Sequence, residues 1–232
     1  MRYFLLTFTL TYILFSCKPS SPAEPGLEKE CPDSLYSAPM DPSLQYIEIP
    51  DQHFEEYLID KGYDSDGLLN GQMKRSDANE VDSIFLHSSS IASAPEYDVI
   101  KSVKGIEHFE KLRVFYSTNE LIEKIDFSHN KKLQYVFIMD YHGSVGGGPG
   151  RDKYRALKHI NLGKNPNLKE VVLSSTLLTE LDVSGLSSLD KLTIGGYELE
   201  TIYIHGKKQI KPGWDIIPSN EKTVVYKICE NP

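Results

Sequence analysis

The residues of this chain that could do chemistry are three cysteines, seven histidines and many scattered carboxylates. Cys17, Cys31 and Cys229 lack the C-x-x-C spacing of a structural zinc site. The histidines form no H-E-x-x-H metalloprotease motif, and the sequence contains no G-x-S-x-G nucleophile elbow. The sequence therefore predicts a protein that is not an enzyme and that requires no cofactor for catalysis.

Cys17 is the residue with the clearest expected modification. Arg2 precedes an apolar run of 13 residues, 3–15, which has the length of a signal-peptide core and is too short for a membrane-spanning helix. The run ends in Leu-Phe-Ser-Cys, which resembles a bacterial lipobox. That resemblance implies cleavage after residue 16 and attachment of lipid, including palmitate, to Cys17. An ordinary secretory signal with an incidental cysteine is the alternative.

Residues 17–43 are rich in proline and serine and predict an extended, disordered tether. We expect an exported protein held at the cell envelope, at the outer membrane, by its N-terminal lipid alone. No acidic run follows Cys17, so surface and periplasmic orientations both stay open. If Cys17 is acylated, Cys31 and Cys229 remain, and the sequence does not decide whether they form a disulfide.

Asp64 and Asp66 are weak candidates for a calcium site. Asp64-x-Asp66-Gly67 matches the middle of an EF-hand-type loop. In that alignment the first position is Gly62 and the twelfth is Met73, so the first ligand and the bidentate acid are both missing. A plain Asp/Gly turn is the favoured interpretation, with calcium as the alternative.

Residues 112–206 contain several copies of one sequence repeat, and the fold of these repeats must position any functional side chain within them. Apolar residues recur in five columns at a spacing of 21 residues, interrupted once by a 14-residue insert, 142–155. The columns are Leu112, Leu133, Leu168 and Leu189; Phe115, Val136, Val171 and Leu192; Ile122, Leu157, Leu178 and Leu199; Ile125, Ile160, Leu181 and Ile202; and Phe127, Leu162, Val183 and Ile204. Such a period predicts a solenoid of short parallel strands with 3₁₀ or irregular connections. An ordinary β-rich domain would not keep this register.

The repeats "LIEKIDFSHNKKL", "LKHINLGKNPNL" and "LTELDVSGLSSL" resemble those of bacterial leucine-rich-repeat lipoproteins. Asn130 and Asn165 occupy the asparagine position of the L-x-x-L-x-L-x-x-N pattern, and Leu186 replaces it in the third copy, which predicts a missing rung of the asparagine ladder. The resemblance covers about 46–226 and includes the segment that begins at Gly105. It implies a leucine-rich-repeat solenoid of the cell-surface or outer-membrane type.

Five segments follow from these patterns: a signal peptide, 1–16; the tether, 17–43; an N-terminal cap, 44–80; the solenoid with its insert, 81–206; and a C-terminal cap, 207–232. In the N-terminal cap, alternation predicts a short strand near Tyr46, and Phe54, Tyr57 and Leu58 predict one apolar helix face. In the C-terminal cap, Trp214 and a strand over 223–228 are expected to cover the last rung.

Val81, Ile84 and Leu86 predict the first rung of the solenoid and copy the second triplet of columns, the one that contains Ile122, Ile125 and Phe127. Val103, Ile106, Phe109 and Leu112 are spaced three apart, which predicts a 3₁₀ or short α segment. The column containing Asp126, Asn161, Asp182 and Tyr203 is expected to face solvent and to do no acid–base work.

Two places are candidates for binding a partner. The glycine-rich insert is flanked by exposed aromatic and basic residues of the types that anchor interfaces, Tyr141, His142, Arg151 and Tyr154. A disordered insertion without a role is the alternative. The second candidate is the strand face that carries Tyr116 and Phe137, whose outward aromatic rings predict an exposed patch. A loop folded over them is the alternative.

The formal net charge of −8 argues against a nucleic-acid partner. The sequence thus predicts a lipid-anchored, non-catalytic module that binds a protein or glycan through the solenoid face and the insert. The competing prediction is a structural or assembly subunit of an outer-membrane or adhesion complex without a ligand of its own.

Overall fold

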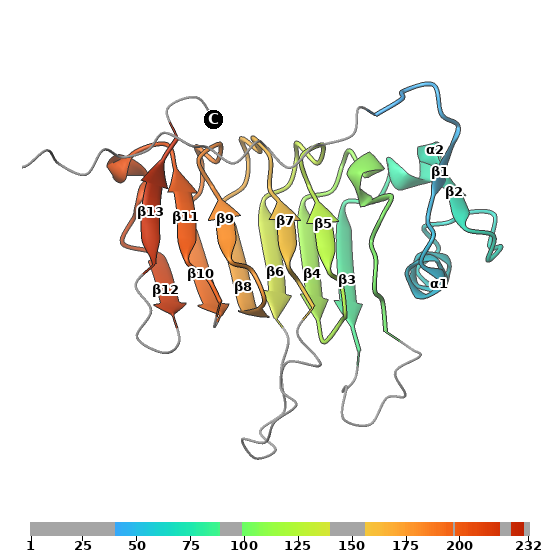
Figure 1. The fold of residues 1–232 in the computed structure, drawn as a ribbon. Coiled ribbons are helices and arrows are strands. Elements are labelled where there is room, and N and C mark those ends of the chain that lie inside the picture. The colour runs from blue at the N-terminus through green and yellow to red at the C-terminus, as the bar shows by residue number, and fades with distance from the viewer. Residues whose placement is uncertain (1–39, 89–98, 140–155, 197, 219–223, 230–232) are drawn as a thin grey trace, which may run out of the picture.

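The fold is that of a computed structural model, which describes residues 40–88, 99–139, 156–196, 198–218 and 224–229. Parallel β-strands dominate these residues and helices are few (Figure 1). The helices are α1 (Gln52–Asp60), α2 (Arg75–Ala78) and the 3₁₀ turns η1 (Ile106–His108) and η3 (Lys207–Gln209). The strands are β1 (Tyr46–Glu48), β2 (Gln72–Lys74), β3 (Ser83–His87), β4 (Val114–Thr118), β5 (Lys124–Asp126), β6 (Tyr135–Met139), β7 (His159–Asn161), β8 (Glu170–Thr176), β9 (Glu180–Asp182), β10 (Lys191–Gly196), β11 (Thr201–Ile204), β12 (Trp214–Pro218) and β13 (Val225–Ile228).

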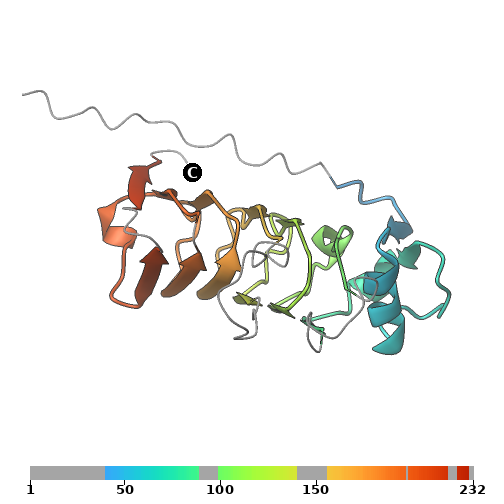
Figure 2. The same cartoon turned by 60° about the horizontal axis from the view of Figure 1, so that its bottom comes forward.

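Each repeat places one strand in each of two layers (Figure 2). The long sheet has the order β12-β10-β8-β6-β4-β3 and is parallel throughout. The second layer contains the shorter strands, as the sheets β13-β11-β9 and β5-β7, which are also parallel. Only the β1–β2 pair is antiparallel among the described strands. This mostly parallel β architecture agrees with the short parallel strands predicted from the 21-residue period.

The apolar columns form the core between the two layers. All members of the five columns are buried, with exposed fractions of 0–5%. Paired strands keep the columns in register: Phe115 lies opposite Val136, and Val136 opposite Val171. A fully buried side chain of this kind stabilises the fold by about 1.5–3 kcal/mol relative to an exposed one. One repeat cannot bury its own apolar residues, so each repeat depends on its neighbours.

The prediction for the first rung was wrong in its register. β3 pairs with β4, so Ile84 lies opposite Phe115 and Leu86 opposite Ser117. Val81, Ile84 and Leu86 therefore match the first triplet of each repeat, which consists of the lead leucine and the residues three and five positions after it, such as Leu112, Phe115 and Ser117. This triplet belongs to the long sheet. They do not match the second triplet. Both triplets have the same L-x-x-L-x-L spacing, so spacing alone cannot separate them.

Buried side-chain amides link successive repeats. Asn130 Nδ2 donates to the carbonyl oxygens of Ile106 and Phe109 at 2.9 and 3.0 Å. Asn165 Nδ2 donates to those of Phe127 and Leu162 at 2.9 and 2.7 Å. The carbonyls of Ile106, Phe109 and Phe127 also accept a backbone N–H within their own turns, so each amide adds a second hydrogen bond to an acceptor that can take two.

The third copy has no asparagine at this position, and Leu186 fills it as a fully buried core residue. The amide ladder then resumes one repeat later. Gln209 Nε2 donates to the carbonyl oxygens of Val183 and Leu186 at 2.6 and 3.3 Å. The sequence pattern missed Gln209 because η3 changes the spacing at the end of the repeats.

The N-terminal cap contains the predicted helix and strand. Asp51 caps α1 by accepting from the backbone N–H groups of His53 and Phe54, both at 3.1 Å. The helix ends before Gly62, whose φ of 69° suits the left-handed C′ position. Glu55 is buried, and its Oε1 accepts from the backbone N–H groups of residues 70–72, which ties α1 to the start of β2.

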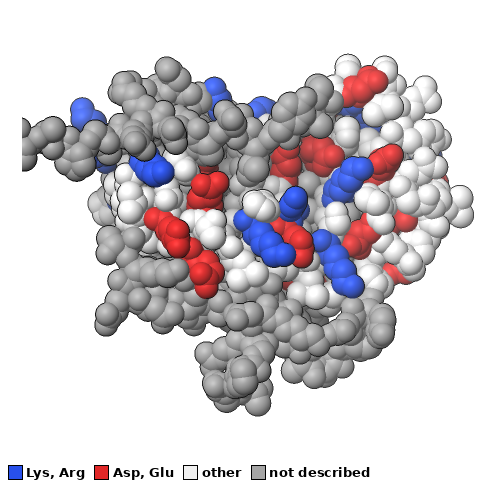
Figure 3. Space-filling model, in the orientation of Figure 1, with Lys and Arg blue, Asp and Glu red and all other residues white. Residues whose placement is uncertain are grey.

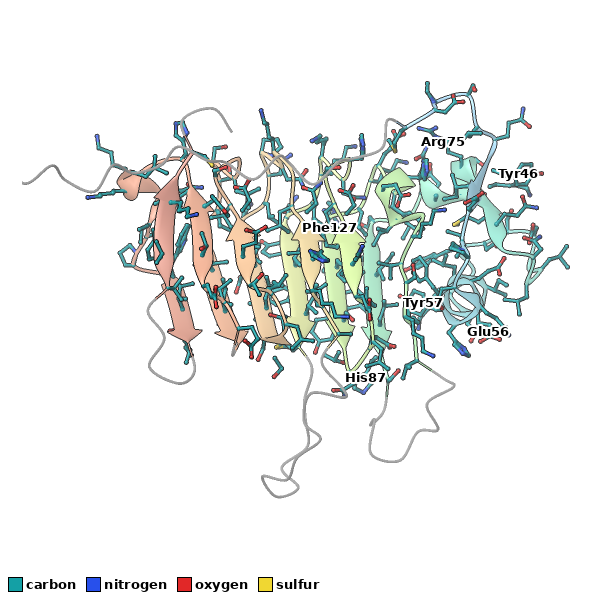
Figure 4. All side chains as sticks on the ribbon, viewed as in Figure 1. Tyr46, Glu56, Tyr57, Arg75, His87 and Phe127 are labelled. Atoms are coloured by element: carbon teal, nitrogen blue, oxygen red, sulfur yellow. The ribbon has the colours of Figure 1, made fainter. Side chains whose placement is uncertain are left out.

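Two tyrosines of the cap cover the open edge of β3. The Phe85 backbone N–H donates to Tyr57 Oη at 2.9 Å, and Tyr63 Oη donates to the Ser83 carbonyl oxygen at 3.2 Å. Tyr57 lies between α1 and β3 (Figure 4). The cap thereby satisfies backbone groups of an edge strand that would otherwise invite association.

The C-terminal cap adds one more strand to each layer. β12 pairs with β10, which places Trp214 opposite Leu192, and β13 pairs with β11. Trp214, Ile216, Tyr226 and Ile228 are partly buried against the core. The expected strand over 223–228 and the covering role of Trp214 agree with this arrangement.

Candidate binding site on the long sheet

The outward face of the long sheet is defined by strand alternation, because successive side chains of a strand point to opposite sides. Ile84, Phe115 and Val136 point into the core, so their neighbours point outward. The outward residues form three columns across the strands. The central column runs Phe85, Tyr116, Phe137, Val172, Thr193 and Asp215.

Four aromatic rings on this face form a continuous row, which we call the aromatic stripe: Phe85, Tyr116, Phe137 and Tyr135. The ring centroids of Phe85 and Tyr116 are 6.1 Å apart, and those of Tyr116 and Phe137 are 6.3 Å apart. Tyr135 stacks on Phe137 with a centroid distance of 6.5 Å and an interplanar angle of 11°. Phe85 is 53% exposed and the other three rings are partly exposed.

Polar side chains lie beside the aromatic stripe and beyond its Tyr135 end. On one side, His87 Nδ1 and Thr118 Oγ1 are 2.6 Å apart at the carboxyl ends of β3 and β4, where Figure 4 labels His87. On the other side, Glu170 and Lys191 lie in the column of Tyr135, and the Lys191 Nζ to Glu170 Oε2 distance is 3.6 Å. His87 is thus an exposed polar group at one margin of the stripe, and the Glu170–Lys191 pair lies beyond its Tyr135 end.

Of the predicted partner-binding residues, the structure places Tyr116 and Phe137 side by side on this face. Tyr141, His142, Arg151 and Tyr154, together with Cys17, lie outside the described residues. Phe85 was missed because the first rung was assigned to the wrong columns. With β3 in its observed register, alternation alone would have placed Phe85 beside Tyr116. Tyr135 follows from the same alternation.

The calcium candidates take part in an Asp/Gly turn. Asp66 accepts from the backbone N–H of Leu68 at 2.8 Å and from Asn70 Nδ2 at 3.2 Å. Asp64 is buried, which raises the pKa of its carboxyl, and its Oδ1 accepts from the Asp66 N–H at 3.3 Å. Within the described parts of the chain, no three His, Cys, Asp or Glu side chains are grouped so that they could hold a metal ion.

The outward polar column of the second layer closes turns. Asp126 Oδ1 accepts from the Ser128 N–H at 2.8 Å, Asn161 Oδ1 from the Gly163 N–H at 3.0 Å, and Asp182 Oδ1 from the Ser184 N–H at 2.8 Å. These are Asx turns that end each short strand. Tyr203, the fourth member, was expected to face solvent but is only 6% exposed. Its Oη donates to Glu180 at 3.2 Å and Lys227 Nζ lies 5.7 Å from its ring.

One buried acid lies where the N-terminal cap meets the first repeat. Glu120 is 4% exposed and accepts from the Ile100 backbone N–H at 2.7 Å and from Ser88 Oγ at 2.9 Å. Burial raises the pKa of its carboxyl to about 7. Nearby, Asp51 Oδ2 accepts from the backbone N–H groups of Lys101 and Ser102, both at 2.9 Å. Glu120 and Asp51 thus bind the backbone N–H groups of residues 100–102, in the segment that leads to η1.

A separate hollow of about 540 Å³ lies by the second layer. Its lining includes His108, Lys124, Asp126, His129 and His159. Burial lowers the pKa of His108. Acids and bases are mixed in this lining, so it presents no concentration of one charge.

Acidic and basic side chains also alternate on the face shown in Figure 3. Ion pairs also join neighbouring repeats, such as Lys158 with Glu123 at 3.0 Å and Arg113 with Asp82 at 2.8 Å. Such exposed pairs are each worth about 0–1 kcal/mol.

The end of the described chain is covalently tied. Cys229 is fully buried and disulfide-bonded, and its N–H donates to the Ile204 carbonyl oxygen at 2.7 Å. Cys17 and Cys31, the other two cysteines, lie outside the described residues. As for membranes, the described helices include none that is long and apolar enough to cross one.

A scan against protein-family models finds no match to this chain, and a search of curated proteins finds no similar sequence.

Proposed function

We propose that the chain is a leucine-rich-repeat solenoid that acts as a lipid-anchored, non-catalytic binding module at the bacterial cell envelope. Its ligand, a protein or a glycan, contacts the outward face of the long sheet around Tyr116 and Phe137. The observation that carries this proposal is the aromatic stripe. These aromatic rings lie on the outward face of the sheet, stay partly exposed and do not belong to the core cluster, as is typical of a contact surface.

The solenoid assignment is supported by the 21-residue register, by the parallel pairing of successive repeats and by the buried amides of Asn130 and Asn165. The anchoring assignment is supported by the apolar N-terminal segment that ends at Cys17. Export and anchoring would place the aromatic stripe outside the cytoplasm, with the tether, 17–43, as the spacer.

Anchoring is tested by growing cells that produce the full chain with radiolabelled palmitate. The wild-type chain is expected to incorporate label and to fractionate with membranes, whereas Cys17→Ser is expected to do neither. The matched control is Cys31→Ser, which is expected to keep both properties. An unmodified residue 17 by mass spectrometry would exclude lipid anchoring.

Binding is tested with the full chain purified in detergent and with envelopes from cells that encode it. The double variant Tyr116→Ala/Phe137→Ala is expected to bind these envelopes about 5- to 150-fold more weakly than wild type, because each lost aromatic contact is worth about 0.5–1.5 kcal/mol. Tyr46→Ala removes an exposed ring from β1, far from the stripe in sequence, and serves as control. Equal binding by all three proteins would contradict the proposed binding face.

A further inference from the structure

We propose that the aromatic stripe is a binding site for a neutral glycan chain that runs across the strands, with one sugar unit over each of Phe85, Tyr116 and Phe137. This inference rests on the proposed function and names the ligand class of the same face. A pyranose ring has an apolar face of C–H groups and an edge of hydroxyl groups. It therefore matches an aromatic ring beside hydrogen-bonding side chains.

The geometry of the row fits a chain of rings. Each of the three strands contributes one ring to the central column, and the centroid distances are 6.1 and 6.3 Å. These distances are comparable to the length of one sugar unit in an extended glycan. The rings of this column are tilted to one another by 36° and 44°, so they are not stacked face to face. Tyr135 widens the row at its Phe137 end.

The charge of the surface selects a neutral ligand. The central column is uncharged from Phe85 to Thr193. In the column of Tyr135, the charges of Glu170 and Lys191 lie 3.6 Å apart and offset each other. A charged polysaccharide or nucleic acid would find no opposite field here, and the net charge of −8 would repel a polyanion. The exposed imidazole of His87, held by the buried hydroxyl of Thr118, offers a hydrogen bond instead.

The shape of the stripe favours a glycan over a protein. Protein interfaces bury about 800 Å² on each partner, and their strongest contacts cluster at the centre, with arginine enriched. The stripe is a narrow row along the sheet, and none of its three outward columns contains arginine among the described residues. A linear ligand that crosses the strands covers such a row more completely than a rounded protein surface does.

The test is isothermal titration calorimetry of the detergent-purified full chain with neutral, β-linked glucose, mannose and N-acetylglucosamine oligomers of one to six units. At least one series is expected to bind, with affinity rising steeply up to three units and changing little beyond, because three rings are engaged. Phe85→Ala and Tyr116→Ala are each expected to weaken binding of the hexamer about 3- to 10-fold. Both changes are on the surface, and far-ultraviolet circular dichroism checks that the variants stay folded.

Tyr46→Ala is the matched control and is expected to bind like wild type. Oligomer binding that Phe85→Ala and Tyr116→Ala leave unchanged would overturn the assignment of the stripe. If no oligomer series binds while Tyr116→Ala/Phe137→Ala still weakens binding to envelopes, the glycan inference fails and the binding face stands, with a protein as its ligand. Failure to bind both oligomers and envelopes would contradict the inference and the proposed function together.

Discussion

At the scale of single residues, Glu120 is the most perturbed acid among the described groups. It is almost fully buried, and its two oxygens accept from Ile100 N–H and Ser88 Oγ. These bonds favour the carboxylate, but the loss of hydration is the larger effect and raises the pKa from 4.5 to about 7. The folded protein therefore holds a proton on Glu120 at mildly acidic pH that the unfolded chain has already released.

This difference predicts a pH-dependent stability. Between about pH 4.5 and 7 the carboxyl of Glu120 binds more protons in the folded than in the unfolded state, so its contribution to the free energy of unfolding falls as pH rises through this window. The loss is on the order of 3 kcal/mol at most. The lowered pKa of His108 contributes with the opposite sign below pH 6.5, so the effect of Glu120 is read as the difference between wild type and variant. Glu120→Gln is expected to flatten the dependence and to be more stable than wild type at pH 8, as measured by urea unfolding at pH 5, 6, 7 and 8.

The control is Glu123→Gln, which changes an exposed carboxylate paired with Lys158. It should keep the wild-type slope over the same pH range. If Glu120→Gln also keeps that slope, burial of Glu120 is not the origin of the dependence.

The buried amide of Asn165 gives a second prediction at this scale. Asn165→Ala removes the donor to two backbone carbonyls inside the fold and is expected to lower the free energy of unfolding by about 2–3 kcal/mol. Asn167 Nδ2 also donates to a backbone carbonyl, that of Lys131, but it is exposed. Asn167→Ala is expected to cost under about 0.5 kcal/mol. Similar losses in the two variants would contradict a structural role for the buried ladder.

At the scale of elements, β3 shows how the cap and the repeats depend on each other. Among the described strands none pairs with its outer edge, and the tyrosines of the cap bind the Phe85 N–H and the Ser83 carbonyl. Burial raises the pKa of Tyr57, while the hydrogen bond from the Phe85 N–H acts in the opposite direction. The cap is therefore part of the sheet's hydrogen bonding as well as a cover for its core.

Tyr57→Phe is expected to leave the Phe85 N–H unpaired, to destabilise the fold by about 1 kcal/mol and to speed hydrogen exchange at Phe85. Tyr46→Phe changes an exposed tyrosine of the same cap and should affect neither quantity. Unchanged exchange at Phe85 in Tyr57→Phe would mean that the edge of β3 does not rely on this hydroxyl.

The elements differ in how far the sequence predicted them. The columns led by Leu112 and Leu133 were predicted correctly because burial in stacked repeats imposes a period that few other constraints disturb. The helix start at Asp51 was predicted because an N-cap has a local chemical cause. The register of β3 was not, since its L-x-x-L-x-L spacing fits both layers. Gln209 could not be identified either, because its role depends on the position of a turn and not on a repeated spacing.

The sequence likewise predicted some residues of the candidate site and not others. Tyr116 and Phe137 could be predicted to point outward, because their neighbours in the same strands, Phe115 and Val136, belong to the buried apolar columns. Phe85 could not be added without the correct register of β3. The distances between the rings and the pairing of Glu170 with Lys191 depend on how neighbouring repeats stack, and spacing along the sequence does not give them.

At the scale of the whole molecule, the end of the chain is joined covalently to a part that lies outside the described residues. Cys229 is disulfide-bonded at the end of β13. If Cys17 carries lipid, Cys31 is the remaining cysteine. Peptide mapping under non-reducing conditions is therefore expected to recover a Cys31–Cys229 pair. A bond between Cys17 and Cys229 would contradict both this pairing and the lipid anchor.

Breaking that bond should loosen the last repeat first. A cross-link between distant parts of a chain stabilises a fold by about 2–4 kcal/mol, mainly by restricting the unfolded state. Cys31→Ser is expected to lower the Tm and to speed hydrogen exchange in β12 and β13 before β4 and β6, since stacked repeats transmit stability only to their neighbours. Uniform loss across all strands would contradict this order.

We propose the outward face of the long sheet at β3, β4 and β6 as the ligand-binding surface of the molecule. Hydroxyl-radical footprinting of the full chain, read by mass spectrometry with and without saturating cell envelopes, tests this claim most directly. Oxidation of Phe85, Tyr116, Tyr135 and Phe137 is expected to fall on binding, while oxidation of Tyr46 stays constant. Unchanged oxidation of these four rings, with protection elsewhere on the chain, would contradict it.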